Sequence, residues 1–257
     1  MNDYYEPQYA PKRERVTWAV QRLILVNALV FVAQLAIDIP LGYQVSEAHR
    51  FAPPGGVASG LLAFQPHLFM SGLVWKAFTY QFLHGGLMHL FMNMLWLFFF
   101  GPQVERALGT REFFRFYLIC GTVAVLATVL PWLAWGRQVS VTGASGAVMA
   151  LLVAFAMINP ERQFYLFPLP VPINARAMVI IVIVMNVFWG MGRNSTTSVA
   201  THFGGMAVGY LYMKTVPVFR RWQLEQRRRH SAREESVDPA GDMVDNVFKF
   251  ENHKRRH

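Results

Sequence analysis

The amino-acid sequence predicts an all-α membrane protein in which six helices cross the bilayer and both termini lie in the cytoplasm. The first observation is composition: 54% of the 257 residues are hydrophobic and only 15% are charged, whereas a soluble domain carries about a quarter charged residues. The second is a series of apolar runs, which lie at Trp18–Ile37, Leu83–Phe100, Phe113–Trp135, Ala144–Ile158, Ala177–Gly190 and Thr201–Val218. Because a full crossing needs roughly 20 apolar residues, each run is a candidate transmembrane helix, and some are short for one.

The distribution of basic residues predicts the orientation of these helices. The chain has 24 Lys and Arg residues, of which only Arg50, Lys76, Arg137 and Arg193 lie in the segments that follow the first, third and fifth runs. The other twenty lie around the termini and the segments that follow the second and fourth runs. Cytoplasmic segments carry the excess of Lys and Arg in membrane proteins, so both termini are expected in the cytoplasm. The first run is too long for the apolar part of a signal peptide and has no convincing cleavage site.

The topology divides the chain into three regions. Residues 1–17 form a cytoplasmic N-terminal tail, residues 18–218 a six-span domain, and residues 219–257 a basic cytoplasmic C-terminal tail. The arginine clusters of the last region are typical of segments that contact anionic lipid headgroups, an interpretation that we favour over nucleic-acid binding. The segment Asp38–Phe82 is a long extracytoplasmic connection with many apolar and aromatic residues. It is expected to fold partly into the outer leaflet.

Polar residues of three different runs lie at the same predicted depth, in the outer third of the membrane. His84, His89 and Asn93 lie in the first part of the second run, Ser145 begins the fourth run, and His202 begins the sixth. Each has a simple structural explanation when taken alone: a serine among glycines packs helices, an asparagine bridges helices, and a neutral histidine is tolerated near an interface. The shared depth favours a common site, because polar residues inside membranes usually face the bundle interior and mark function.

The residue types at this depth indicate nucleophilic catalysis. Ser145 and His202 would act as nucleophile and base without an acidic partner, since no acidic residue lies at this depth within the runs. His89 and Asn93 are four residues apart on one helix face, and with the backbone N–H of Ser145 they would form an oxyanion hole. His84 is assigned a supporting role beside them. Three histidines without a carboxylate or thiolate do not indicate zinc, so neither a metal nor a cofactor is expected.

Small residues are expected to bring the fourth and sixth runs together. Gly205 and Gly209 form a Gly-x-x-x-Gly pattern, which lets two helices pack tightly and moves the histidine towards the serine. Gly143, Ala144 and Gly146 surround the serine and are assigned, with His89 and Asn93, to the support of the oxyanion. The two glycines among them let another backbone or a substrate approach closely. Met149, one turn after the serine, is expected to pack at this Ser–His pair.

Five motifs, in order along the chain, resemble the rhomboid family of intramembrane serine proteases. They are Trp75-Lys76, HGGLMHLFMNMLWLFFFG at 84–101, GPQVERALG at 101–109, GASG at 143–146 and HFGGMAVG at 202–209. The resemblance implies a six-helix bundle at residues 18–218, with a short fourth helix below a water-filled cavity, Ser145 as nucleophile and His202 as base. It implies cleavage of transmembrane segments of other membrane proteins near the extracytoplasmic face. The six-span form is most like bacterial members, which indicates the plasma membrane. Glu105 lies in the motif GPQVERALG, which resembles a cytoplasmic turn of the family. It is expected to tie that loop to a helix end.

Three positions depart from the family pattern. Met149 stands where many members have a tyrosine that stacks on the histidine, Thr201 precedes His202 in place of Gly or Ala, and Lys76 replaces an arginine. None of these changes removes a catalytic group, so an active serine endopeptidase is expected. The alternative is a non-proteolytic rhomboid-like protein that binds transmembrane clients, although such relatives usually lack the serine or the histidine. A six-span transporter is a weaker interpretation, because the polar residues cluster on one side of the membrane.

Overall fold

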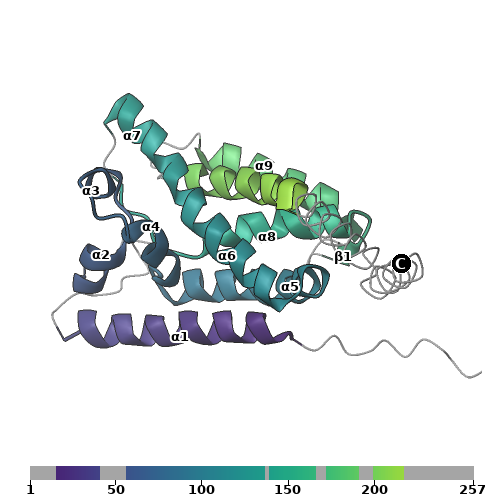
Figure 1. Cartoon of the computed structure of the whole chain (residues 1–257), viewed down its shortest axis with the longest axis horizontal. Helices are drawn as coiled ribbons and strands as arrows, with labels where there is room; N and C mark the ends of the chain where they lie inside the picture. Colours follow the sequence, from purple (N-terminus) through teal and green to yellow (C-terminus); the bar gives the residue numbers. More distant parts are fainter. Residues whose placement is uncertain (1–15, 41–55, 137–138, 166–171, 191–198, 217–257) are drawn as a thin grey trace, which may run out of the picture. The chain divides into compact units, whose positions relative to one another are not determined.

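The computed structural model of the chain describes residues 16–40, 56–136, 139–165, 172–190 and 199–216 (Figure 1). The predicted N-terminal tail, apart from residues 16 and 17, and the basic C-terminal tail lie outside these residues. The described part is mostly helical and includes one two-stranded sheet. Residues up to Met213 belong to one unit, to which the following description applies.

Each of the six predicted apolar runs overlaps a helical segment. These segments are α1 (Trp18–Asp38), α5 (Leu87–Leu108), α6 (Thr110–Ala124) continued by η3 (Val125–Thr128) and α7 (Val129–Trp135), α8 (Ser145–Ile158), α9 (Ala175–Gly190) and a helix over residues 199–216. Among the described residues, three stretches are long and apolar enough to cross a membrane: Trp18–Asp38, Leu87–Leu108 and Thr110–Trp135. α8 and α9 are apolar but shorter. The prediction of a helical chain with several membrane spans is therefore confirmed.

The second run forms a helix that begins later than the apolar pattern predicts. α5 starts at Leu87, after Gly85 and Gly86, so His84 lies in the turn before the helix. Glycine explains this boundary, because it is less favourable than alanine inside a helix by about 1 kcal/mol. The turn is held by Gln34 of α1, whose side-chain amide donates to the backbone oxygen of His84 at 3.0 Å and accepts from its N–H at 3.2 Å.

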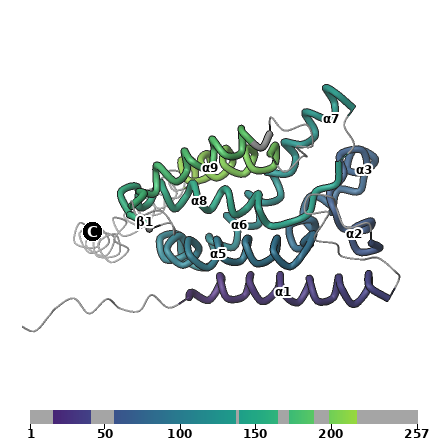
Figure 2. Tube along the Cα trace, turned by 180° about the vertical axis from the view of Figure 1, so that it is seen from behind, coloured from purple at the N-terminus to yellow at the C-terminus, as the bar shows by residue number. Residues whose placement is uncertain are grey.

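α8 lies at the centre of the helical core. Every residue from Gly146 to Ala156 is buried, and α8 contacts α5, α6 and α9 (Figures 1 and 2). Its sequence explains this position, because a helix that is apolar on all faces is stable only when it is covered on all sides. The large side chains Leu151, Leu152 and Phe155 are fully buried in this core. The enclosed helix therefore presents its first residue, Ser145, inside the bundle.

The outer helices carry apolar side chains on their exposed faces. On α1 these include Leu25, Leu29 and Val32, and on α9 they include Val184 and Phe188. Large exposed apolar patches are unusual in monomeric soluble proteins. A helix with such a surface suits the hydrocarbon core of a bilayer, where its backbone groups are already paired within the helix. The outer surface is therefore that of helices surrounded by lipid.

The connection between α1 and α5 is folded where the structure describes it. It contains α2 (Val57–Leu62), α3 (Pro66–Met70), α4 (Lys76–Thr79) and η2 (Tyr80–Phe82), while residues 41–55 lie outside the described part. Lys76 is fully buried, and its Nζ donates to the carbonyl oxygens of Gly60 at 2.6 Å and Ala63 at 3.3 Å. Burial lowers the pKa of Lys76 below its usual value of 10.5. This lysine fastens the C-terminal part of α2 to α4.

Glu105 joins the turn between α5 and α6 to the start of α1. Its carboxylate accepts hydrogen bonds from the backbone N–H groups of Ala19 and Val20, both at 3.1 Å, and from the hydroxyls of Thr17 and Thr110. A carboxylate is favoured at this point, because the first N–H groups of a helix have no acceptor within the helix. The prediction that Glu105 ties this loop to a helix end is confirmed.

A short hairpin precedes α9. β1 (Gln163–Tyr165) pairs antiparallel with β2 (Pro172–Asn174), and Gln163 lies opposite Asn174. Asn174 then caps α9, since its side-chain oxygen accepts a hydrogen bond from the backbone N–H of Ala177 at 2.8 Å. The cap fixes the residue at which α9 begins.

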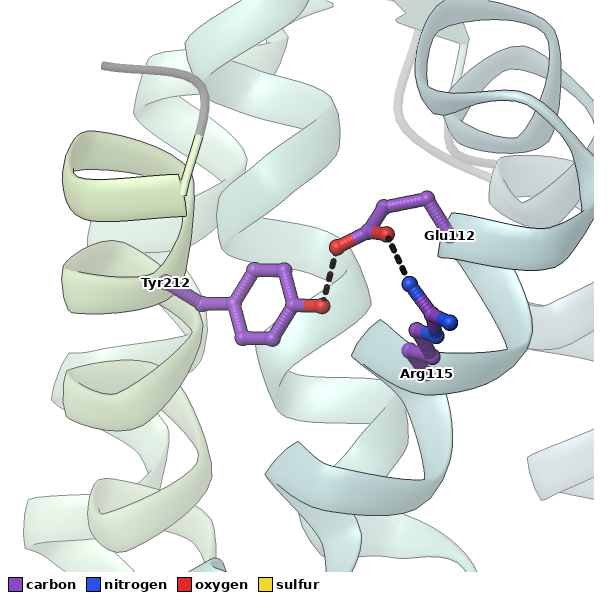
Figure 3. A network of polar contacts seen from close by, with 3 residues as sticks. All are labelled: Glu112, Arg115 and Tyr212. Carbon is purple, nitrogen blue, oxygen red and sulfur yellow. Dashed lines mark hydrogen bonds and ion pairs between the residues drawn. The ribbon is translucent and has the colours of Figure 1, made fainter. Parts of the chain in front are cut away.

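The helix over residues 199–216 is attached to α6 through a buried carboxylate. The hydroxyl of Tyr212 donates to Glu112, and the guanidinium of Arg115 lies 3.6 Å from the other carboxylate oxygen (Figure 3). Glu112 is only 4% exposed. A buried carboxylate is costly unless it is hydrogen-bonded or paired, so these contacts favour one position of the helix against α6.

Candidate active site

The turn that precedes α8 is held by backbone hydrogen bonds. Val141 forms an antiparallel bridge with Phe64, with N···O distances of 3.0 and 2.8 Å. Two residues later, the N–H of Gly143 donates to the carbonyl of Tyr80 at 3.0 Å. Gly143 has a φ of +109°, a conformation that side chains of L residues rarely adopt. The turn therefore needs glycine at this position to deliver Ser145 to the start of α8.

Ser145 lies at the positive end of a buried helix. The first hydrogen bond of α8 runs from the N–H of Val148 to the carbonyl of Ala144, the N-cap residue, at 3.0 Å. The N–H groups of residues 145–147 thus have no acceptor within the helix. These groups and the helix dipole favour negative charge at this point, which is where a negative charge would form during attack by the serine hydroxyl.

Tyr80 ties this helix end to α6. It is fully buried, and its hydroxyl donates to the carbonyl of Gly121 at 2.6 Å. A Cβ atom built on Gly146 would lie 3.1 Å from the same hydroxyl oxygen. Tyr80 thus contacts the turn through its backbone and α8 through its side chain, so it limits movement of the segment that carries the serine.

The ring of His89 lies against Gly143. A Cβ atom built on this glycine would be 2.5 Å from Cε1 and 2.6 Å from Nε2 of the imidazole. On the other side of the ring, the N–H of Gly85 donates to Nδ1 at 3.4 Å. If Nδ1 is the acceptor, the ring proton of neutral imidazole sits on Nε2, and this assignment rests on the hydrogen-bond partners. The donor nitrogen of His89 is then the one that faces the serine turn.

Asn93 lies one turn after His89 on α5. It is 5% exposed, and its Nδ2 donates to the carbonyl of His89 at 2.9 Å. An amide has two N–H donors, so the bond within the helix uses one of them and orients the side chain. His89 and Asn93 project from consecutive turns of the same face, as their spacing requires.

Glycines bring the helix over residues 199–216 onto the start of α8. A Cβ atom built on Gly205 would fall on the carbonyl group of Gly146. One built on Gly209 would lie 2.7 Å from Cα of Ala150. Contacts this short mean that the two backbones touch, which larger residues would prevent. The interface places the first turns of both helices side by side.

His202 lies at the same end of this interface as Ser145. Its neighbour Thr201 packs on α8, with Cγ2 at 3.0 Å from a Cβ atom built on Gly146. Ser145 and His202 are both partly exposed, in contrast to the buried residues that follow the serine. Within the described part of the chain no hydrogen bond joins their side chains. Such bonds often tighten only when a substrate is bound.

Comparison with known proteins identifies the fold. Residues 71–218, more than half of the chain, match the Rhomboid domain family. The chain belongs to the rhomboid family. Together with the three stretches that are long and apolar enough to cross a membrane, this membership identifies a multi-pass integral membrane protein.

Three relatives show how far the similarity of this rhomboid extends. The rhomboid protease GlpG of Salmonella newport is 30% identical over 162 residues, which are 61% of this chain and 49% of GlpG. RHOMBOID-like protein 5 of Arabidopsis thaliana is 29% identical over 155 residues, 54% of this chain and 50% of that protein. RHOMBOID-like protein 4 of the same plant is 42% identical over 78 residues, 30% of this chain and 19% of that protein. The chain thus spans half or less of the length of these relatives.

The remaining predicted site residues of the rhomboid domain lie around the serine turn. His84 is fully buried, and its ring centroid lies 5.2 Å from that of His89. Within the described part of the chain, neither ring nitrogen of His84 has a hydrogen-bond partner. Met149 is 9% exposed and belongs to the same buried cluster as Met206 of the 199–216 helix.

Two polar side chains that contact site residues are absent from the prediction. Asn186 of α9 has its Oδ1 at 2.6 Å from Nδ1 of His202. Gln34 of α1 pairs with both backbone groups of His84. Each is a polar residue within an apolar run, and polar residues inside spans usually face the bundle. A polar residue within an apolar run could therefore have marked Asn186 and Gln34 as candidates, but this pattern does not say which neighbour each side chain contacts.

Proposed function

We propose that this rhomboid is a serine endopeptidase that cleaves transmembrane segments of other membrane proteins through a Ser145–His202 dyad. The observation that carries the proposal is the backbone contact between Gly205 and Gly146, which brings the serine and histidine ends of two helices together. The position of His89 against the serine turn supports the same conclusion. So does the similarity to a protein named as a rhomboid protease.

In the proposed reaction, the hydroxyl oxygen of Ser145 attacks the carbonyl carbon of the substrate peptide bond. Nε2 of His202 takes the hydroxyl proton as the new C–O bond forms and the carbonyl π electrons move to the oxygen. The tetrahedral intermediate then collapses, the C–N bond breaks, and His202 returns its proton to the amine leaving group. A water molecule, deprotonated by His202, then attacks the carbonyl carbon of the acyl ester. The second tetrahedral intermediate collapses, the C–O bond to Ser145 breaks, and His202 returns the proton to the serine oxygen as the product carboxyl group leaves.

The oxyanion of this intermediate would be stabilised by donors at the serine turn. The candidates are the backbone N–H of Ser145, Nε2–H of His89 and the second amide N–H of Asn93. Donors that are held in place before the reaction stabilise charge without reorganisation, and loss of one typically costs about a hundredfold to a thousandfold in rate. The bonds from Gly85 to His89 and from Asn93 to the His89 carbonyl provide such orientation.

The proposal includes the six-span topology with both termini in the cytoplasm. It rests on the excess of Lys and Arg at the termini and in the segments after the second and fourth runs. In this orientation the N-terminus of α8 faces the extracytoplasmic side, and substrates would be cut near that face. The relatives come from a bacterium and a plant, so the bacterial plasma membrane is proposed from the six-span form alone.

Labelling of the purified protein with a fluorophosphonate probe in liposomes tests the proposal, combined with cleavage of a model transmembrane substrate. Wild type is expected to label and to cleave, and Ser145→Ala and His202→Ala are expected to lose both signals. The matched controls are Ser71→Ala and His67→Ala. These residues form a local hydrogen bond at the C-terminal end of α3, from the serine hydroxyl to the histidine carbonyl, and their replacement should leave both signals intact.

The outcomes separate the proposal from its alternative. Folded wild type that neither labels nor cleaves, but retains a transmembrane client in a pull-down from liposomes, would favour the non-proteolytic client-binding protein. Labelling that persists in Ser145→Ala would place the nucleophile elsewhere and would overturn the dyad.

A further inference from the structure

Asn186 of α9 forms a hydrogen bond with His202. A second hydrogen bond of the same side-chain amide shows which of the two groups is the donor. Its Oδ1 lies 2.6 Å from Nδ1 of His202. Its Nδ2 donates to the carbonyl of Val182, one turn back on α9, at 2.8 Å. Because only the NH₂ end of the amide can donate to a carbonyl, Oδ1 must be the end that faces the imidazole. Oδ1 is an acceptor, so Nδ1 of His202 must be the donor.

This contact selects one tautomer of His202. A neutral imidazole has a single ring proton, and if Nδ1 carries it then Nε2 has a free lone pair. A base that removes the proton of a serine hydroxyl needs that lone pair on the nitrogen facing the serine. The other tautomer would present an N–H at Nε2 and could not accept the proton. Asn186 therefore prepares the imidazole for the role of a base.

The histidine and its partner come from different helices, so the contact also fixes the orientation of the ring. Asn174 caps the start of α9, and Glu112 holds the 199–216 helix through Tyr212 (Figure 3). Both helices are thus anchored at points away from the histidine. An imidazole held at Nδ1 between two anchored helices can turn about its side-chain bonds only by breaking the bond to Asn186.

We propose that Asn186 is a positioning residue that sets the tautomer and the ring orientation of His202. The inference rests on the proposed function, since it assigns to His202 the role of general base. Asn186 acts through His202 and is not itself placed against a substrate. As a neutral acceptor it can orient the imidazole but offers less stabilisation of an imidazolium than a carboxylate would, because hydrogen bonds to ionised groups are stronger.

The test uses three variants of the full chain in liposomes. Asn186→Leu keeps the branched shape and the number of heavy atoms of the side chain but removes the acceptor, and Asn186→Asp retains an oxygen that can accept. Asn27→Leu is the matched control, since Asn27 of α1 makes the same kind of bond to the carbonyl four residues back, at 2.8 Å to Leu23. For Asn186→Leu we expect kcat on the model substrate to fall about tenfold with KM unchanged, the effect of one lost hydrogen bond. Asn186→Asp should recover most of this loss, and Asn27→Leu should leave kcat as in wild type.

The second readout is the tautomer of His202, from the ¹⁵N chemical shifts of its ring nitrogens, with the signal assigned by comparison with His202→Ala. Wild type and Asn186→Asp are expected to show the proton on Nδ1, and Asn186→Leu is expected to lose this preference. An unchanged tautomer in folded Asn186→Leu, or equal loss of kcat in Asn186→Leu and Asn186→Asp, would overturn the inference. If wild type neither labels nor cleaves but the tautomer still depends on Asn186, the proposed function fails while the positioning contact stands.

Discussion

Replacing Gly205 with alanine would place a methyl group against the backbone of α8. A Cβ atom at this position falls on the carbonyl of Gly146, at 2.9 Å from its carbonyl carbon and 3.2 Å from its Cα. Non-bonded carbon atoms favour separations of about 3.5–4.0 Å. The obstacle is backbone, which cannot swing aside as the end of a flexible side chain can. The 199–216 helix would therefore have to move away from α8 by about 1 Å to restore normal contact distances.

The displacement predicts effects on both stability and rate. Overpacking of a close interface costs about 1–3 kcal/mol, and misplacing a catalytic group by about 1 Å can cost about a hundredfold in rate. We therefore expect Gly205→Ala to lower Tm, and to lower kcat on a transmembrane substrate about a hundredfold. The loss should exceed that from Asn186→Leu, because moving the helix changes the position of His202 and not only its tautomer.

The assay compares thermal unfolding and substrate cleavage for wild type, Gly205→Ala and Gly60→Ala in the same liposomes. Gly60 is the control because it lies in α2 and a Cβ atom built on it has no neighbour within 4 Å. Gly205→Ala with the Tm and kcat of wild type would refute the reasoning, since the two backbones could not then be in contact. Equal losses in both variants would show that any glycine replacement is harmful and that the effect is not specific to this interface.

Three further substitutions test contacts that support the site. Tyr80→Phe removes the hydroxyl that donates to the carbonyl of Gly121 in the buried core. Loss of this partner should lower the free energy of unfolding by about 1–3 kcal/mol, as measured by thermal unfolding. Glu105→Gln weakens the charge-assisted bonds at the start of α1, so Tm should fall while kcat, measured well below that Tm, stays near the wild-type value. Lys76→Met tests the pH dependence of stability. Because burial lowers the pKa of Lys76, the unfolded state of the wild type binds more protons than the folded state does. The free energy of unfolding of the wild type should therefore rise with pH in the alkaline range below 10.5. Lys76→Met should remove that rise in a pH series of unfolding measurements, and an unchanged slope would show that another group is responsible.

Hydropathy along the chain was sufficient to locate the long apolar helices, but not the short helices α2, α3 and α4 of the connection between α1 and α5. All six predicted runs overlap helical segments, and the fourth begins within one residue of the predicted Ala144. For Glu105 the motif predicted a bond to a helix end, but only the tertiary structure decided that this end is the start of α1, because Glu105 lies in the last turn of α5, far from α1 in the sequence. The boundary of the second run was less well predicted. Apolar residues continue through Leu83, but Gly85 and Gly86 delay the helix to Leu87, so His84 lies in a turn.

The sequence by itself determined which stretches are helical and apolar, which family the motifs resemble, and which residue types could perform catalysis. These are properties of neighbouring residues along the chain. Only the tertiary structure decided that Asn186 meets His202, that Gln34 holds His84, and that Tyr80 links the serine turn to α6. The physical reason is that each contact depends on which faces of two helices touch. Those faces are selected by close packing at positions such as Gly205 and Gly146, and a periodic apolar pattern does not encode that choice of partner.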